Sequence, residues 1–131
     1  MGSVAQVPAI SKGRLWAGII ISALPSILFV VTGLFPFIDP AKAAEGTAHM
    51  GYPVHLGTVI SILEIGCAII YMVPQTSVLG AILLTGYLGG ATASHIRIGE
   101  PPVMPLVVAA LVWLGIYLRE PRLQSVLPVR K

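Results

Sequence analysis

Glu64 is the acidic residue whose surroundings most favour a chemical role, because it stands alone in an apolar stretch running from His55 to Val73. A carboxyl group in such surroundings can exchange a proton or hold the polar group of a ligand. At about 100° per helical residue, Ser61 and Tyr71 fall in the same stripe as Glu64. We therefore predict a catalytic role for Glu64 and ligand-binding roles for Ser61 and Tyr71.

Tyr87 is the predicted partner of Glu64, and lies in the next apolar stretch, from Ser77 to Ser94. If the two stretches form antiparallel helices, both side chains lie roughly 12–14 Å beneath the same end, at 1.5 Å per residue. A carboxyl and a phenol at matched depth could share a hydrogen bond, hold a ligand carbonyl between them or act as an acid–base pair. The alternative is a neutral carboxylic acid that only bonds a neighbouring helix.

The histidines form a further group of candidate residues. His95 lies just past Ser94 and is followed by Arg97 and Glu100, so we predict a catalytic or ligand-orienting role for His95 and ligand-binding roles for the other two. His49, His55 and His95 show no metal-ligand spacing, and no metal is expected. Cys67 is the single cysteine, which excludes an internal disulfide.

The composition indicates the elements that must position these residues. The chain has 131 residues, of which 56% are hydrophobic and 10% charged, and its mean hydropathy is +0.90. A soluble domain carries roughly 25% charged residues, so an integral membrane protein is indicated. The scattered basic residues do not suggest nucleic-acid binding. Four apolar stretches, about 15–38, 55–73, 77–94 and 102–118, are long enough to span a bilayer. They predict one all-α membrane domain over residues 1–131, an antiparallel up-down four-helix bundle.

The positive charges predict how this bundle is oriented. Cytoplasmic loops are enriched in Lys and Arg, and the two terminal segments carry six such residues: Lys12, Arg14, Arg119, Arg122, Arg130 and Lys131. The loops at 39–54 and 95–101 carry only Lys42 and Arg97. We therefore predict cytoplasmic termini. The first stretch is predicted to be an anchor, because a cleaved signal peptide has an apolar region of only about 7–15 residues.

Small residues recur along the third apolar stretch. They form the rows Gly86–Gly90–Ser94 and Thr85–Gly89–Ala93, which are typical of close helix packing in membranes. We predict that Gly86 and Gly90 lie in a tight helix contact. The alternative is that the glycines leave space for a ligand, which makes Gly90 a candidate ligand-binding residue.

The same region resembles a known family. The likeness is carried by three segments of this region, Thr85-Gly86-Tyr87-Leu88-Gly89-Gly90-Ala91, Ser94-His95 and Arg97-Ile98-Gly99-Glu100-Pro101. Together with Glu64 in the second apolar stretch and Gly51-Tyr52-Pro53 before it, they resemble the DoxX-like family of small four-span bacterial membrane proteins. The likeness covers roughly residues 15–120. It implies a four-helix fold in the bacterial cytoplasmic (inner) membrane. It also implies a redox or quinone connection, since the family is named after subunits linked to a membrane thiosulfate:quinone oxidoreductase.

Three functions are compatible with these observations. The first is a site within the bundle for a small apolar ligand, quinone-like or another carbonyl compound, in a redox-associated protein. The second is a cofactor-free enzyme that isomerises or hydrolyses an apolar epoxide or ketone. The third is an accessory subunit that only fixes helix positions in a larger membrane complex. The expected partners are the lipid bilayer, the ligand, and further copies or subunits.

Overall fold

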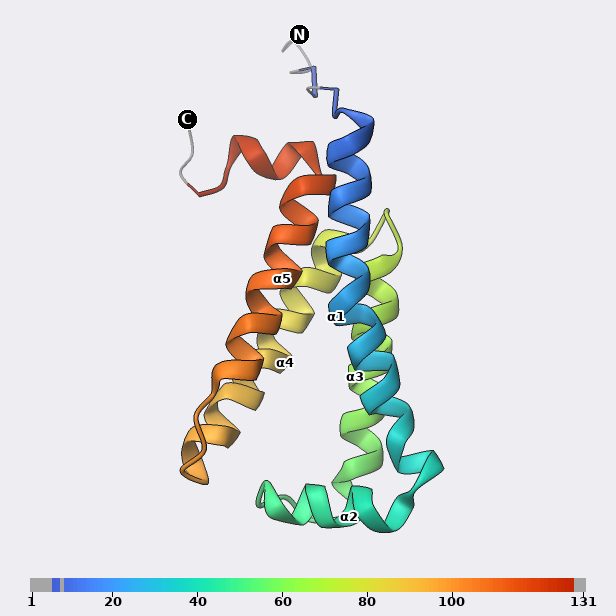
Figure 1. Ribbon diagram of the computed structural model, residues 1–131, viewed down its shortest axis with the longest axis vertical. Coiled ribbons are helices and arrows are strands. Elements are labelled where there is room, and N and C mark those ends of the chain that lie inside the picture. Colours follow the sequence, from blue (N-terminus) through green and yellow to red (C-terminus); the bar gives the residue numbers. More distant parts are fainter. Residues whose placement is uncertain (1–5, 8, 129–131) are drawn as a thin grey trace, which may run out of the picture.

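The computed structural model describes residues 6, 7 and 9–128, and every regular element among them is helical (Figure 1). The elements are α1 (Lys12–Ile38), α2 (Pro40–His49), α3 (Leu56–Met72), α4 (Ser77–Arg97), α5 (Val103–Arg119) and the 3-10 helix η1 (Pro121–Ser125). The all-α class is therefore confirmed, with five α-helices instead of the expected four.

The additional helix, α2, occupies most of the segment expected to be a loop at 39–54. Its start is stabilised locally, because the Asp39 side chain accepts a hydrogen bond from the backbone N–H of Lys42 at 3.1 Å. Pro40 takes the first helical position, where its missing N–H costs nothing. With ten residues and no large apolar side chain, α2 does not stand out in the sequence as an apolar stretch.

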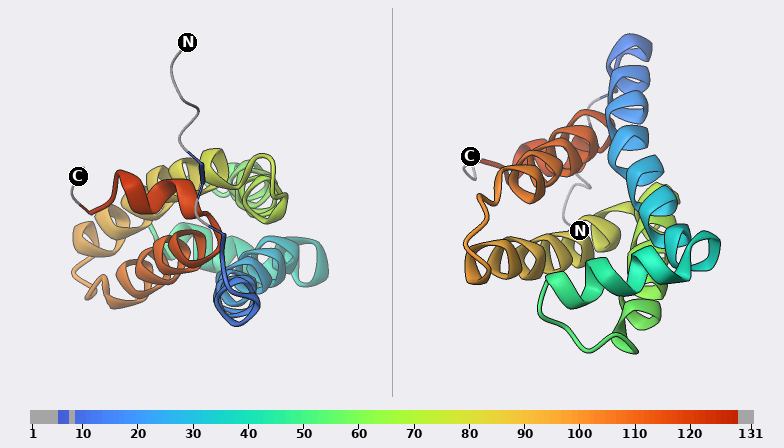
Figure 2. Two further views of the ribbon diagram at one scale, coloured as in Figure 1. Left: turned by 90° about the horizontal axis from the view of Figure 1, so that it is seen from above. Right: turned by 60° about the horizontal axis from the view of Figure 1, so that its bottom comes forward.

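The four apolar helices pack in pairs. Helix α1 packs against α3 and α5, and α4 packs against the same two helices. Seen from above, α1, α3, α4 and α5 surround a common centre (Figure 2, left). The start of α1 and helix η1 lie at one end of the molecule, which we call the terminal end (Figure 1). Helix α2 and the turn between α4 and α5 lie at the other, which we call the α2 end.

The terminal end is closely packed around Tyr71 of α3, which is completely buried. Its hydroxyl donates to the carbonyl of Val112 at 2.7 Å and lies 3.0 Å from the Ser22 hydroxyl. Gly80 of α4 lies so close to Tyr71 that a Cβ would meet the Tyr71 backbone, and a Cβ at Gly115 would meet Ser22. The helices therefore touch at backbone distance here.

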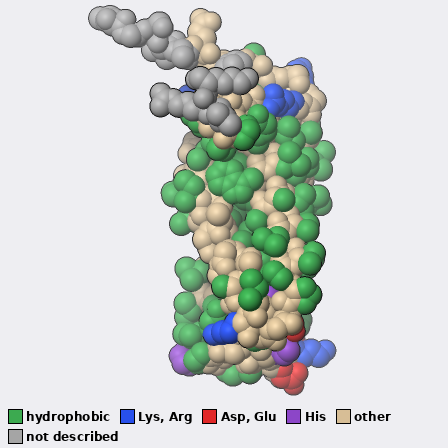
Figure 3. All heavy atoms as spheres, turned by 90° about the vertical axis from the view of Figure 1, so that its left-hand side faces the viewer, with side chains coloured by type: hydrophobic (Ala, Val, Ile, Leu, Met, Phe, Trp, Pro, Cys, Tyr) green, Lys and Arg blue, Asp and Glu red, His purple; other side chains and the backbone are tan. Residues whose placement is uncertain are grey.

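The outer surface is largely apolar. Large hydrophobic side chains cover the middle of the molecule, and charged side chains gather toward its two ends (Figure 3). In the described part of the chain, α1 and α4 are long and apolar enough to cross a membrane, whereas α3 and α5 are apolar helices of 17 residues each.

Candidate functional site

A pocket of about 750 Å³ lies toward the α2 end of the molecule. Its wall is mainly apolar and comes from α1, α2, α3, α4 and the segment after α2. Five of the residues predicted to form a site line it: Ser61, Glu64, Tyr87, Gly90 and His95. The structure thus brings all three predicted catalytic residues to one cavity.

Glu64 lies in the inward-facing stripe of α3 and is only 8% exposed. Its carboxyl oxygen Oε1 forms a hydrogen bond with the hydroxyl of Thr32 on α1. The same hydroxyl lies 2.9 Å from the carbonyl of Leu28. Because a hydroxyl carries one proton, Thr32 can donate to only one of them at a time. When it donates to Leu28, the carboxyl must be the donor and hence protonated.

Tyr87 of α4 lines the same pocket as Glu64. Its ring is held by an edge-on contact with Phe29 of α1, with ring centroids 5.7 Å apart and an interplanar angle of 87°. The carboxyl, the Thr32 hydroxyl and the phenol form one group in the pocket wall, which we call the deep polar group. Together they can donate and accept hydrogen bonds.

Gly86 and Gly90 do not lie in a tight helix contact, so the packing prediction for them was wrong. A Cβ at either position would have nothing within 4 Å, and both residues line the pocket. The physical reason is the direction of their helix face: it points into the cavity, whereas Gly80 points at α3. The alternative prediction, that these glycines leave space, agrees with the structure at Gly86 and Gly90.

His95 lies on the last turn of α4 and lines the pocket. Its ring nitrogen Nδ1 is 2.8 Å from the carbonyl of Ala91. A carbonyl oxygen only accepts, so Nδ1 must carry the proton. The other nitrogen, Nε2, is then a hydrogen-bond acceptor whenever the imidazole is neutral.

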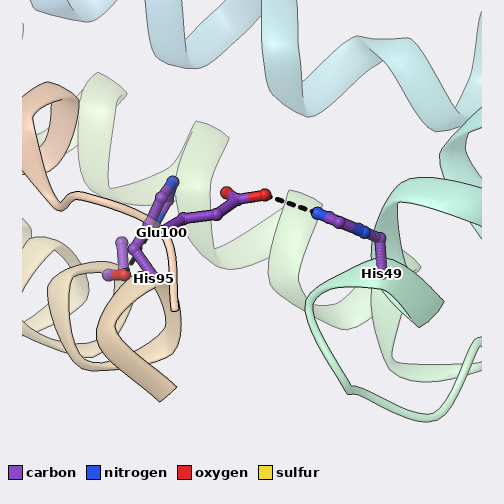
Figure 4. A network of polar contacts seen from close by, with 4 residues as sticks. His49, His95 and Glu100 are labelled. Carbon is purple, nitrogen blue, oxygen red and sulfur yellow. Dashed lines mark hydrogen bonds and ion pairs between the residues drawn. The ribbon is translucent and has the colours of Figure 1, made fainter. Parts of the chain in front are cut away.

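Arg97 and Glu100 lie outside the pocket lining. Arg97, at the end of α4, contacts the segment after α2, and Glu100, in the turn after α4, contacts the last residue of α2. The Glu100 carboxylate pairs with His49 Nε2 at 2.7 Å (Figure 4). Arg97 donates to the Met50 carbonyl at 2.5 Å, and its guanidinium lies 5.0 Å from the centre of the Tyr52 ring. At the α2 end, these contacts link α4 and the turn after it to α2 and the segment that follows α2.

The remaining predicted residues fall elsewhere. Tyr71 is held in the closely packed terminal end, away from the pocket lining. His55 directly precedes α3 and is exposed, and Cys67 is a free thiol that is half-buried. Within residues 6, 7 and 9–128, no group of three or more His, Cys, Asp or Glu side chains could hold a metal ion.

Thr32, Thr47 and Tyr52 are polar pocket residues that are not among the candidate residues predicted from the sequence. Thr32 is a hydroxyl in an apolar stretch, and such a group needs a partner, which was the available signal. Tyr52 was considered only as part of the Gly51-Tyr52-Pro53 motif. Its hydroxyl lies 2.6 Å from the Ser94 hydroxyl, a contact between segments far apart in sequence.

Comparison with known proteins gives one family match. A family model described as the DoxX-like family matches residues 20–115, which extend from α1 into α5. No curated protein and no solved structure matches the chain.

Proposed function

Because the chain belongs to the DoxX-like family, we propose that it is a multi-pass protein of the bacterial cytoplasmic (inner) membrane. In this proposal α1, α3, α4 and α5 form an antiparallel up-down bundle that spans the bilayer. The 17 residues of α3 and of α5 correspond to about 26 Å of helix, near the lower limit for a hydrocarbon core of about 30 Å. The apolar middle of the surface supports this proposal (Figure 3).

The charge distribution supports cytoplasmic termini. The terminal end carries Lys12, Arg14, Arg119 and Arg122 together with one acidic residue, Glu120. The α2 end carries Lys42 and Arg97 together with three acidic residues, Asp39, Glu45 and Glu100. This asymmetry favours the terminal end on the cytoplasmic side. The predicted contributions of Arg130 and Lys131 lie outside the described residues.

Within this bundle, the pocket binds a small apolar ligand that carries an oxygen group. One observation supports this most strongly: a cavity of about 750 Å³ has an almost completely buried carboxyl, that of Glu64, in its otherwise mainly apolar wall. Ligand pockets commonly have volumes of about 300–1,000 Å³ and few polar groups. The glycines at 86 and 90 keep the volume open. A quinone-like or other carbonyl compound fits this chemistry, and the redox association comes from the family resemblance.

A second candidate function is acid–base catalysis without a cofactor. It is favoured by the presence of a carboxyl, a phenol and an imidazole acceptor, from Glu64, Tyr87 and His95, in the wall of one pocket. An epoxide or ketone bound between them could be protonated by one group and deprotonated by another. Turnover of such a substrate would separate this function from simple binding.

The experiment is a search for retained ligand in detergent-purified protein, by organic extraction with mass spectrometry and by absorbance. We expect an apolar oxygen-containing compound in wild-type protein and its loss in Gly90→Leu, whose side chain would occupy the pocket without meeting a neighbour at Cβ. The matched control is Gly89→Leu on the same helix, because a Cβ there also has nothing within 4 Å and Gly89 lies outside the pocket lining. We expect Gly89→Leu to retain the ligand.

The role of the deep polar group is tested with Glu64→Gln and Tyr87→Phe. If the carboxyl handles protons or a polar ligand group, Glu64→Gln should abolish ligand retention or turnover while the thermal melt stays nearly unchanged. The double variant should show coupling above about 0.5 kcal/mol. Wild-type protein without retained ligand, together with strict additivity of the two substitutions, would instead favour the accessory-subunit function.

A further inference from the structure

The hydroxyl protons at the α2 end of the pocket can be assigned one by one. Thr47 donates its proton to the carbonyl of Ala43 at 2.9 Å, and Ser94 donates its proton to the carbonyl of Gly90 at 2.8 Å. Because the Ser94 proton is used in this way, the 2.6 Å contact between Tyr52 and Ser94 must have Tyr52 as the donor. All three hydroxyl protons are therefore committed inside the protein.

His95 follows the same pattern. Its Nδ1 proton is donated to Ala91, which leaves Nε2 of the neutral ring with a lone pair. Like Thr47, Tyr52 and Ser94, it lines the pocket. These four side chains, which we call the acceptor group, can therefore accept further hydrogen bonds but cannot donate one without breaking an internal bond. The deep polar group differs, because it can do both.

Two pocket-lining side chains outside the acceptor group can still donate: the hydroxyl of Ser61 on α3 and the ammonium of Lys42 on α2. The Lys42 side chain is 72% exposed, and its ammonium lies 3.6 Å from the Asp39 carboxylate. Its protons are therefore shared with Asp39 and with the surroundings outside the pocket. The acceptor group keeps lone pairs that can accept a hydrogen bond from a ligand.

We propose that the pocket binds a hydrophobic alcohol or phenol whose hydroxyl donates to the acceptor group, with His95 Nε2 as its principal acceptor. This inference rests on the proposed ligand pocket and adds the ligand's polarity and orientation. A ligand with only acceptor oxygens satisfies the deep polar group but leaves the α2 end unpaired. A ligand hydroxyl at the α2 end pairs with this acceptor group, while the deep polar group keeps its own Thr32–Glu64 hydrogen bond. Pairing the acceptors favours binding, since unpaired polar groups in a buried site reduce affinity.

The test compares 4-octylphenol with its methyl ether, which has the same apolar body but no donor. Protein in lipid nanodiscs is equilibrated with each probe, and empty nanodiscs supply the correction for partition into lipid. We expect wild-type protein to bind the phenol about 3- to 10-fold more tightly than the ether, the value of one hydrogen bond. His95→Phe should bring this ratio close to 1 while ether binding persists. His55→Phe, at an exposed histidine outside the pocket lining, should keep the wild-type ratio.

A measurement on wild-type protein makes the test independent of how the variants fold. In protein with ¹⁵N-labelled histidine, the phenol should shift the Nε2 resonance of His95 and the ether should not. Equal binding of the two probes by wild-type protein, or a ratio lost in Glu64→Gln but kept in His95→Phe, would overturn the inference alone. Binding of neither probe would overturn the ligand pocket itself.

Discussion

Gly80→Ala adds a single methyl group at a position where α4 lies at backbone distance from α3. The new Cβ would lie against the backbone of Tyr71 and 2.7 Å from its Cβ, about 0.7 Å inside ordinary van der Waals contact. Backbone atoms cannot rotate away, so α3 and α4 must separate. Overpacking of this kind costs about 1–3 kcal/mol, and the clash with backbone favours the upper end. Alanine returns about 1 kcal/mol through its higher helix propensity. We expect a net loss of about 2 kcal/mol.

Thermal unfolding in detergent measures this loss, and we expect a Tm lower by roughly 6–10 °C. The control is Gly86→Ala, the same substitution on the same helix, where the added Cβ has nothing within 4 Å. Its Tm should stay the same or rise. The reasoning is refuted if the two variants melt alike, or if Gly86→Ala is the more damaging of the two.

Two further predictions concern side chains outside the pocket lining. Arg97→Ala removes the hydrogen bond to the Met50 carbonyl and the contact with the Tyr52 ring, so amide hydrogen exchange across residues 40–52 should become faster; exchange at the wild-type rate would show that these contacts do not hold the segment. Tyr71→Phe removes a hydroxyl that donates to the buried Val112 carbonyl, which should cost about 1–3 kcal/mol in thermal or denaturant unfolding and leave probe binding unchanged. Weakened binding with a normal melt would instead connect Tyr71 to the pocket.

The helical class and the inward-facing stripe of α3 could be predicted from the sequence. A carboxyl group within an apolar helix is expected to face the inside of the bundle, because its exposure to lipid is costly. Ser61, Glu64 and Tyr71 are all buried on that stripe, as predicted. Depth arithmetic also predicts that Tyr87 and Glu64 lie in one site, and both line the same pocket. Such predictions need only helical periodicity and an antiparallel neighbour.

What the sequence could not supply is the direction in which each small residue faces. Gly80 and Gly86 are chemically identical and only six residues apart, yet one touches a backbone and the other borders a cavity. Tyr71 lies on the same stripe of α3 as Glu64, but Glu64 borders the pocket whereas Tyr71 is packed closely against the neighbouring helices. The partner of Glu64 on α1, Thr32, depends on helix rotation, and α2 depends on a local cap. None of these is encoded in hydrophobic periodicity.

The glycines along α4 have two different roles: one allows close packing of two helices, and the others leave the cavity open. Gly80 lies in the close contact between α3 and α4, where an added Cβ would clash with Tyr71, whereas Gly86 and Gly90 border a volume that side chains can enter. Substitutions at Gly86 and Gly90 can therefore reduce the cavity one methyl group at a time without disturbing the contact between α3 and α4. The volume of the cavity and the packing of the helices can thus be varied independently of each other along one helix.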